Sequence, residues 1–305
     1  MTTIQSACQH ISLNPALKRK LDRIERTWPQ KEKQKLIDMI LGKEKAPKPP
    51  TQPFKVTQFD QVIPSETRLA LSVSGPLLKN MSGLTQQLTP HLPQVQGLDL
   101  SHQRQSAPLL ALFAQQPGNL RELNLSYTQP DLKQVAQLLR HHPHLKTLNL
   151  SKNAFDQPPP QEFLDALKAH KHLRILTLSE TKITDFTSWA NHLPTTLRVL
   201  DIDENPLSNH SSWLPLLKEL KSINLSNTQL TETHSEALLR LISESNTLQG
   251  LTLNKNSLTD TFATQLAAKF AEPLILSSLS FADTQISSFG EKAIEVANKS
   301  YPTLI

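Results

Sequence analysis

The sequence predicts an α/β solenoid, a stack of strand and helix units that continues over most of the 305 residues. Three observations carry this prediction. The nine-residue pattern Leu-x-x-Leu-x-Leu-x-x-(Asn/Thr) recurs in eight copies, the copies follow one another at intervals of 23 to 28 residues, and helix-like stretches lie between them. A period of this length is the signature of a repeat architecture in which neighbouring units share one continuous core.

The pattern predicts parallel strands stacked side by side. Its Leu-x-Leu step has the two-residue period of a strand, which sends the leucines into the core and the residue between them to the opposite face. A degenerate ninth copy from Arg68 is expected to form the first strand. The eight clear copies read VQGLDLSHQ from Val95, LRELNLSYT from Leu120, LKTLNLSKN from Leu145, LRILTLSET from Leu173, LRVLDIDEN from Leu197, LKSINLSNT from Leu220, LQGLTLNKN from Leu248 and LSSLSFADT from Leu276.

Amphipathic helices are expected between the strands. Stretches after four of the copies carry an apolar stripe, and Asp131 and several threonines stand where an N-cap would lie. Alternating strands and helices place a curved parallel sheet on the concave side and helices on the convex side. The expected helices lie within 131–142, 159–170, 231–242 and 259–270.

The two shortest repeats, anchored at Leu176 and Leu200, each place a tryptophan 13 residues after the anchor. A shortened helix buries less apolar surface, and an indole ring can fill the space that it leaves. Trp189 and Trp213 are therefore predicted to be stacked core residues rather than an aromatic box for a ligand.

The last position of the pattern alternates between threonine and asparagine, beginning with Thr128, Asn153, Thr181 and Asn205. Side chains there can bond backbone groups where the chain leaves the strand. This alternation, the helical second half and the repeat length resemble the ribonuclease-inhibitor-like subtype of leucine-rich-repeat proteins. The resemblance covers about 240 of the 305 residues and implies a leucine-rich-repeat solenoid.

The N-terminal part differs in charge and composition. Residues 1–55 hold 12 Lys and Arg against 5 Asp and Glu, whereas the rest of the chain holds 20 against 22. Residues 1–53 are predicted to form a small, basic, helical N-terminal cap that ends in a Pro-rich linker. Residues 54–305 are predicted to form the leucine-rich-repeat domain, with about nine repeats.

No catalytic residue, cofactor or metal site is predicted. Cys8 is the only cysteine, which excludes an internal disulfide and favours a reducing compartment. No Gly-rich phosphate loop is present. Two histidine groups suggest a metal site, but both stand where a helix ends before a strand, a position at which polar residues are ordinary. These histidines are His141, His142, His144, His170 and His172.

The concave face is the predicted protein-binding surface. It is formed by the outward position of each strand and the two residues after it. The predicted contact residues are Asp99, His102, Glu122, Asn124, Tyr127, Asn149, Lys152, Thr177, Glu180, Asp201, Asp203, Glu204, Asn224, Asn227, Asn254 and Lys255.

Four carboxylates gather in the middle of this face, and no basic residue shares their positions. They are Glu180, Asp201, Asp203 and Glu204. Their repulsion must be offset, and a partner protein with a basic patch would offset it and bind faster. Tyr127 is a possible anchor toward the N-terminal side.

A basic residue also fills the second position of five successive copies. This row could contact phosphates, but no aromatic residues accompany it for base stacking, so a solvated beginning of each strand is predicted. The row comprises Arg121, Lys146, Arg174, Arg198 and Lys221.

The leading hypothesis is a non-enzymatic binding protein, monomeric alone. The resemblance implies that it acts by occupying a partner's surface. The most specific form of this hypothesis is that it blocks the active site of an enzyme. The composition and short helical N terminus are similar to leucine-rich-repeat effectors of intracellular bacterial pathogens, which implies a host protein or another effector as partner. A cytoplasmic site of action, reached by a non-classical secretion route, is expected because no signal sequence or membrane span is evident.

Two other functions remain open. The basic segment 1–55 could dock an adaptor on a membrane or a nucleic acid. A GTPase regulator is the other alternative, since one family of GTPase-activating proteins has similar repeats, but no residue here can be assigned that role.

Overall fold

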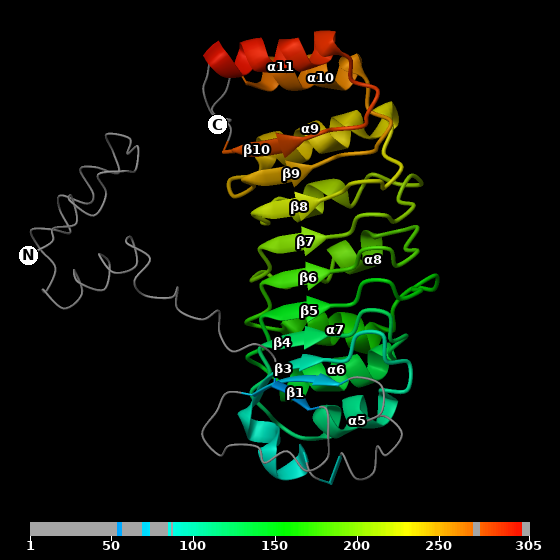
Figure 1. Ribbon diagram of the computed structural model, residues 1–305. Helices are drawn as coiled ribbons and strands as arrows, with labels where there is room; N and C mark the ends of the chain where they lie inside the picture. The colour runs from blue at the N-terminus through cyan, green and yellow to red at the C-terminus, as the bar shows by residue number, and fades with distance from the viewer. Residues whose placement is uncertain (1–53, 57–68, 74–84, 87, 271–274, 301–305) are drawn as a thin grey trace, which may run out of the picture. The chain divides into compact units, whose positions relative to one another are not determined.

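The computed structural model of the chain describes residues 54–56, 69–73, 85–86, 88–270 and 275–300 (Figure 1). All of these residues belong to the unit that spans Pro53–Ile305. The predicted helical cap, its linker and Cys8 lie outside the described residues.

The described residues form ten parallel strands in one sheet, ordered as in the chain. Pairing from β2 onward aligns the pattern leucines, beginning with Leu71 opposite Leu98 and ending with Leu251 opposite Leu279, so the predicted repeats are confirmed. The strands are β1 (Phe54–Val56), β2 (Leu69–Val73), β3 (Val95–Asp99), β4 (Glu122–Asn124), β5 (Thr147–Asn149), β6 (Ile175–Thr177), β7 (Val199–Asp201), β8 (Ser222–Asn224), β9 (Gly250–Thr252) and β10 (Ser278–Ser280).

One strand was not predicted. Phe54 of β1 pairs with Leu71 of β2, so a strand precedes the segment from Arg68 that was expected to be the first. β1 is only three residues long and carries no pattern leucine, which explains why the repeat pattern does not reveal it.

Helices follow most strands and lie on one side of the sheet (Figure 1). Asp131 caps α6 as predicted, because its carboxylate accepts from the backbone N–H of Lys133 at 2.8 Å. The α-helices are α5 (Ala107–Gln115), α6 (Leu132–His141), α7 (Gln161–Ala169), α8 (Thr187–Ala190), α9 (Ser235–Glu244), α10 (Asp260–Lys269) and α11 (Ser288–Ser300), and the 3-10 helices are η2 (Thr89–Gln94), η3 (Leu214–Leu217) and η4 (Glu232–His234).

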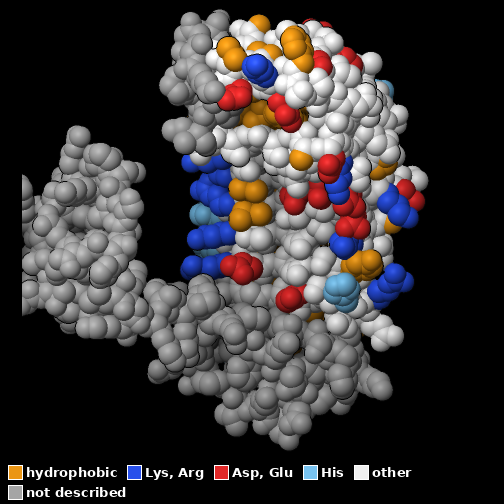
Figure 2. All heavy atoms as spheres, turned by 45° about the horizontal axis from the view of Figure 1, so that its top comes forward, with side chains coloured by type: hydrophobic (Ala, Val, Ile, Leu, Met, Phe, Trp, Pro, Cys, Tyr) orange, Lys and Arg blue, Asp and Glu red, His pale blue; other side chains and the backbone are white. Residues whose placement is uncertain are grey.

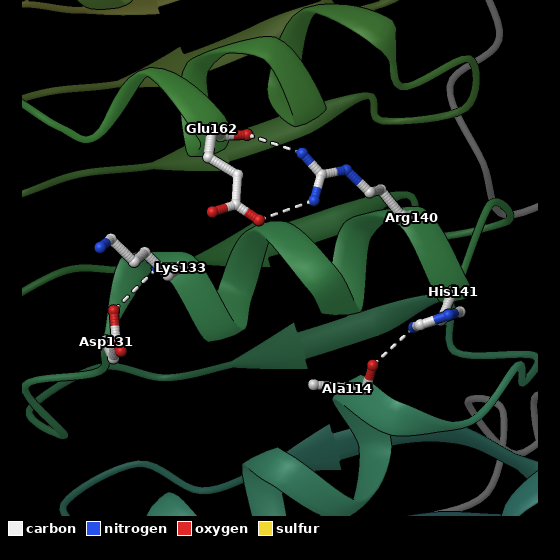
Figure 3. A network of polar contacts seen from close by, with 6 residues as sticks. All are labelled: Ala114, Asp131, Lys133, Arg140, His141 and Glu162. Atoms are coloured by element: carbon white, nitrogen blue, oxygen red, sulfur yellow. Dashed lines mark hydrogen bonds and ion pairs between the residues drawn. The ribbon is translucent and has the colours of Figure 1, made fainter.

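Polar contacts tie neighbouring helices together (Figure 3). The guanidinium group of Arg140 in α6 bonds the carboxylate of Glu162 in α7 at 2.8 Å and its backbone carbonyl at 3.3 Å. On the other side of α6, Nδ1 of His141 lies 2.5 Å from the carbonyl oxygen of Ala114 in α5. The helices are therefore held in register by contacts with the neighbouring repeats on both sides.

The two tryptophans fill the core where the helices are shortest, as predicted. Trp189, within α8, is 1% exposed, and Trp213, directly before η3, is 0% exposed; α8 and η3 have four residues each. Phe186 contacts both indoles, with ring centroids 6.3 Å and 5.5 Å away. The stacked rings supply apolar area that a longer helix would otherwise bury.

The alternating threonines and asparagines join neighbouring repeats in pairs. Oδ1 of Asn205 accepts from the backbone N–H groups of Thr181 and Ile183, at 3.0 and 3.1 Å. Its Nδ2 donates to the carbonyls of Leu178 and Ile202 at 2.8 and 2.9 Å, so one buried amide serves two turns. Asn153 and Asn256 do the same for the turns that carry Thr128 and Thr228.

Two of the histidines are structural parts of the turns that end helices. His142 is 1% exposed, its Nε2 donates to the carbonyl of Phe113 at 2.8 Å, and its Nδ1 accepts from the N–H of Leu120 at 3.4 Å. His170 repeats the arrangement, with Nε2 3.2 Å from the carbonyl oxygen of His142 and Nδ1 accepting from Leu173. Within the described residues, no three His, Cys, Asp or Glu side chains form a metal-binding group.

Candidate protein-binding surface

The strand face is the side of the sheet opposite the helices, together with the turn that follows each strand. Figure 2 shows this face with a column of basic side chains at one edge, mostly uncharged side chains in the middle, and acidic, basic, histidine and hydrophobic side chains at the other edge. The predicted contact residues all lie on this face, in rows that run along the stack.

The outermost of these rows, here called the turn row, has an unusual backbone. Each member has a positive φ between 52° and 63°, a backbone conformation that residues other than glycine rarely adopt. This backbone conformation accompanies a hydrogen-bond ladder that continues past the ends of the strands. The N–H of Tyr127 donates to the backbone carbonyl of Ser151, and the N–H of Lys152 donates to that of Ser179. The row comprises His102, Tyr127, Lys152, Glu180, Glu204, Asn227, Lys255 and Asp283.

Four residues of this surface were missed by the sequence prediction. Asp283 completes the turn row, and its signal is present, because it fills the same position of the last copy. Gln129, Lys182 and Gln229 also have positive φ, and all three are exposed directly after a threonine turn. Their common place after the threonine could have identified them.

In a second row, at the ends of the strands, many side-chain oxygens accept hydrogen bonds from the protein's own backbone. Oδ1 of Asp99 and of Asn149 each accepts from a backbone N–H two residues further on, at 2.9 Å in both. Asn124 and Asn224 make the same bond at 3.1 Å. The side chains of these four predicted contact residues therefore stabilise the turns that follow the strands, and each residue is half-buried.

Contacts link the turn row from repeat to repeat. The rings of His102 and Tyr127 stack at 4.8 Å, and Nζ of Lys152 lies 5.7 Å from the Tyr127 ring centroid. Lys152 also forms a 2.9 Å ion pair with Glu180, and this hydrogen bond raises the pKa of the lysine. The carboxylate of Glu180 is therefore paired with a cation from the preceding repeat, an interaction that the sequence analysis did not consider.

The remaining carboxylates form the acidic patch, defined here as Asp201, Asp203 and Glu204. Burial raises the pKa of the Asp201 carboxyl, and the charge of Asp203 raises it further, although bonds from the Asp203 backbone and the Ser179 and Asn224 side chains act against this. Oδ1 of Asp203 is shielded from solvent and has no hydrogen-bond partner among the described residues. Among the described residues, no ion pair involves the acidic patch.

Replacing Asp201 with Asn is expected to stabilise the protein at neutral pH by roughly 1 kcal/mol, because it removes repulsion from Asp203 while an amide oxygen can still accept the turn bond. Because folding raises the pKa of Asp201, the protonated carboxyl of the wild type stabilises the fold. That wild-type stabilisation is present at low pH and is lost as the pH rises through the raised pKa. The gain should therefore be small at pH 4 and full at pH 7, measured by urea unfolding at both. Asp99→Asn is the matched control, and an equal gain in it would contradict the explanation.

Comparison with known proteins supports the fold. The leucine-rich-repeat family model, described as Leucine Rich Repeat, matches residues 144–165. No curated protein sequence matches the chain. Among the described helices, none has the length and hydrophobicity that crossing a bilayer requires.

Solved structures with some similarity come from several organisms. The leucine-rich-repeat-containing protein LegL7 from Legionella pneumophila is 17% identical, with 79% of this chain and 94% of that chain covered and a TM-score of 0.46. An internalin, InlF from Listeria monocytogenes, is 18% identical, with 78% and 64% covered and a TM-score of 0.42. This chain thus spans less than two thirds of that internalin. The tropomodulin C-terminal domain from Caenorhabditis elegans is 17% identical, with 36% and 71% covered and a TM-score of 0.30.

The matched repeat at 144–165 is one of the eight pattern copies, and its strand lies within a sheet whose other strands repeat the same register. This fold indicates a protein-interaction module, and the family is generally non-enzymatic. The ribonuclease-inhibitor-like subtype remains a resemblance of sequence. The described residues form a leucine-rich-repeat solenoid.

Proposed function

We propose that this chain is a non-enzymatic binding protein that holds a basic surface of a partner protein against the acidic patch. The observation that carries the proposal is the charge of Asp201 and Asp203, which form no ion pair with the described residues. Burial and repulsion raise the pKa of the Asp201 carboxyl, and within the same part of the chain Oδ1 of Asp203 has no hydrogen-bond partner. Arg or Lys side chains of a partner would supply the opposite charge.

The turn row supports the same surface. Glycine adopts a positive φ without steric cost, yet all eight turn-row positions carry side chains. Strained backbone conformations cluster at functional sites, where the side chain compensates for the cost. Tyr127, 39% exposed and stacked on His102, is a preformed aromatic contact next to the charged residues.

The finer parts of the proposal rest on the sequence. We expect the chain to act as a bacterial effector in the cytosol of a host cell, to be monomeric alone, and to inhibit its partner by covering a functional surface such as an active site. The alternative adaptor would depend on residues 1–55, nearly all of which lie outside the described residues.

The double variant Asp201→Lys/Asp203→Lys is expected to weaken partner binding at least about tenfold, because it places like charge opposite the basic surface. Partners are first captured on the immobilised full chain, identified, and then titrated as purified proteins. Binding by the wild type should weaken steeply with salt, and this salt dependence should be lost in the variant.

The matched control is Asp165→Lys/Glu236→Lys, which changes the net charge equally on exposed positions of α7 and α9. It should retain wild-type affinity. Unchanged affinity and salt dependence in the Asp201/Asp203 variant would exclude the acidic patch as the contact. Assay of the purified partner's own activity, with and without the chain, tests inhibition separately.

A further inference from the structure

The edge of the strand face opposite the turn row carries five cations in line, here called the basic edge. Figure 2 shows them as a column beside the strands. From the second member onward, each backbone N–H donates to the carbonyl of the preceding member, at 2.7 to 2.9 Å. The residues therefore follow one another at the spacing of adjacent strands, about 4.8 Å. The basic edge comprises Arg121, Lys146, Arg174, Arg198 and Lys221.

The cations of the basic edge have no acidic partner within the described part of the chain. The three ion pairs found there are Arg140–Glu162, Lys152–Glu180 and Arg240–Glu244. The guanidinium groups of Arg174 and Arg198 donate instead to backbone carbonyls, such as that of Thr196 at 2.8 Å, which fixes their orientation. A row of like charges at this spacing is unfavourable unless an anion faces it.

An apolar strip lies directly beside the basic edge. Ile175 is 37% exposed on β6, and the register places Val199 of β7 next to it. Figure 2 shows hydrophobic side chains next to the basic column at this level of the stack. Thr147 holds the corresponding position on β5, so the apolar character is local rather than a requirement of the repeat. The surface therefore combines a line of cations with an aliphatic contact.

We propose that the basic edge and the apolar strip bind an acidic amphipathic α-helix of a partner protein, lying along the stack and across the strands. One turn of helix rises about 5.4 Å, close to the strand spacing of about 4.8 Å, so one Asp or Glu per turn can face one cation. The five cations span about 19 Å, which corresponds to about 13 helical residues. Leucines on the adjoining stripe of the helix would pack on Ile175 and Val199.

The width of the strand face favours a helix over a nucleic-acid duplex. The acidic patch begins three residues after Arg198, roughly 10 Å along an extended strand, and an α-helix of about 10 Å diameter fits beside it. Duplex DNA carries phosphates across grooves of about 6 and 12 Å, so its second strand would reach the acidic patch. Aromatic side chains that would stack on unpaired bases are also missing from the basic edge.

The test uses the full chain and a fluorescent, hydrocarbon-stapled peptide of about 14 residues with one glutamate per turn and leucines on the adjoining stripe. The control peptide has the same composition with the glutamates spread around the helix. Fluorescence anisotropy should show at least about fivefold tighter binding of the patterned peptide. Equal binding of the two peptides would overturn the proposal.

Two variants separate charge from apolar contact. Lys146→Glu/Lys221→Glu should weaken binding of the patterned peptide at least about tenfold, whereas Lys133→Glu/Lys168→Glu, the equal charge change on exposed helix positions, should change it less than about twofold. Ile175→Thr, which copies Thr147, should weaken it about threefold. No effect of the Lys146/Lys221 change would refute the assignment of the basic edge.

Two competing ligands complete the experiment. A DNA duplex or anionic vesicles that bind the full chain more tightly than the patterned peptide at 150 mM salt, about physiological ionic strength, and lose binding in Lys146→Glu/Lys221→Glu, would replace the helix proposal. The Asp201→Lys/Asp203→Lys variant should bind the patterned peptide at least as well as the wild type. Failure of the acidic-patch proposal therefore leaves this one intact, and the reverse also holds.

Discussion

Asn205→Ala is expected to lower the free energy of unfolding by about 4 kcal/mol, the largest loss we predict for a polar residue. The substitution leaves the buried N–H groups of Thr181 and Ile183 without their acceptor and deprives the carbonyl of Ile202 of a donor. Each unsatisfied buried group costs about 1–3 kcal/mol. Urea unfolding followed by tryptophan fluorescence measures the effect.

Asn209→Ala is the control for this prediction. Asn209 is exposed and near in sequence, so its loss should change stability by less than about 0.5 kcal/mol. Similar losses in the two variants would show that the Asn205 bonds do not hold the two turns together. A reduced urea dependence in Asn205→Ala would instead indicate that the stack no longer unfolds as one unit.

His142→Ala is expected to cost about 3 kcal/mol at pH 8, because the carbonyl of Phe113 and the N–H of Leu120 lose their partner and a cavity forms beside Gly118. The cost should shrink in acid. Burial lowers the pKa of His142, so the neutral ring stabilises the fold above the unfolded value of about 6.5, and this stability is lost as the pH falls toward the lowered pKa.

Urea unfolding of the wild type and His142→Ala at pH 8 and pH 5 measures this difference. His170 has a lowered pKa for the same reason and remains in both proteins, so only the part due to His142 should disappear. His172→Ala is the control, since that side chain is exposed. A stability difference between wild type and His142→Ala that is the same at both pH values would contradict the linkage.

The sequence predicts the repeats well, because a leucine that faces the core must recur at the same position in every copy. The register from Leu71 to Leu279, the N-cap at Asp131 and the buried Trp189 follow from this periodicity. β1 does not, since three residues contain too little pattern to be recognised.

The strand face was predicted as a set of positions but not as a set of contacts. An Asn or Asp followed by Leu-Ser indicates an outward side chain, yet the side-chain oxygen of Asn149 accepts a hydrogen bond from the backbone N–H of Ser151 in the following turn. The pair of Lys152 and Glu180 was recoverable in principle, because the two residues fill the same position of successive copies. The raised pKa of Asp201 was not recoverable, since it depends on how far the turn buries the carboxyl.

The bonds of Asn153, Asn205 and Asn256 have a consequence for how such a chain can change length. Each asparagine closes its own turn and the threonine turn before it, so the smallest interchangeable piece is two repeats rather than one. Removing one repeat would set two threonine turns or two asparagine turns side by side. Two adjacent threonine turns would lack one asparagine amide, and two adjacent asparagine turns would have one more amide than they need. Gene duplications that lengthen this stack while keeping every turn closed must therefore copy an even number of repeats.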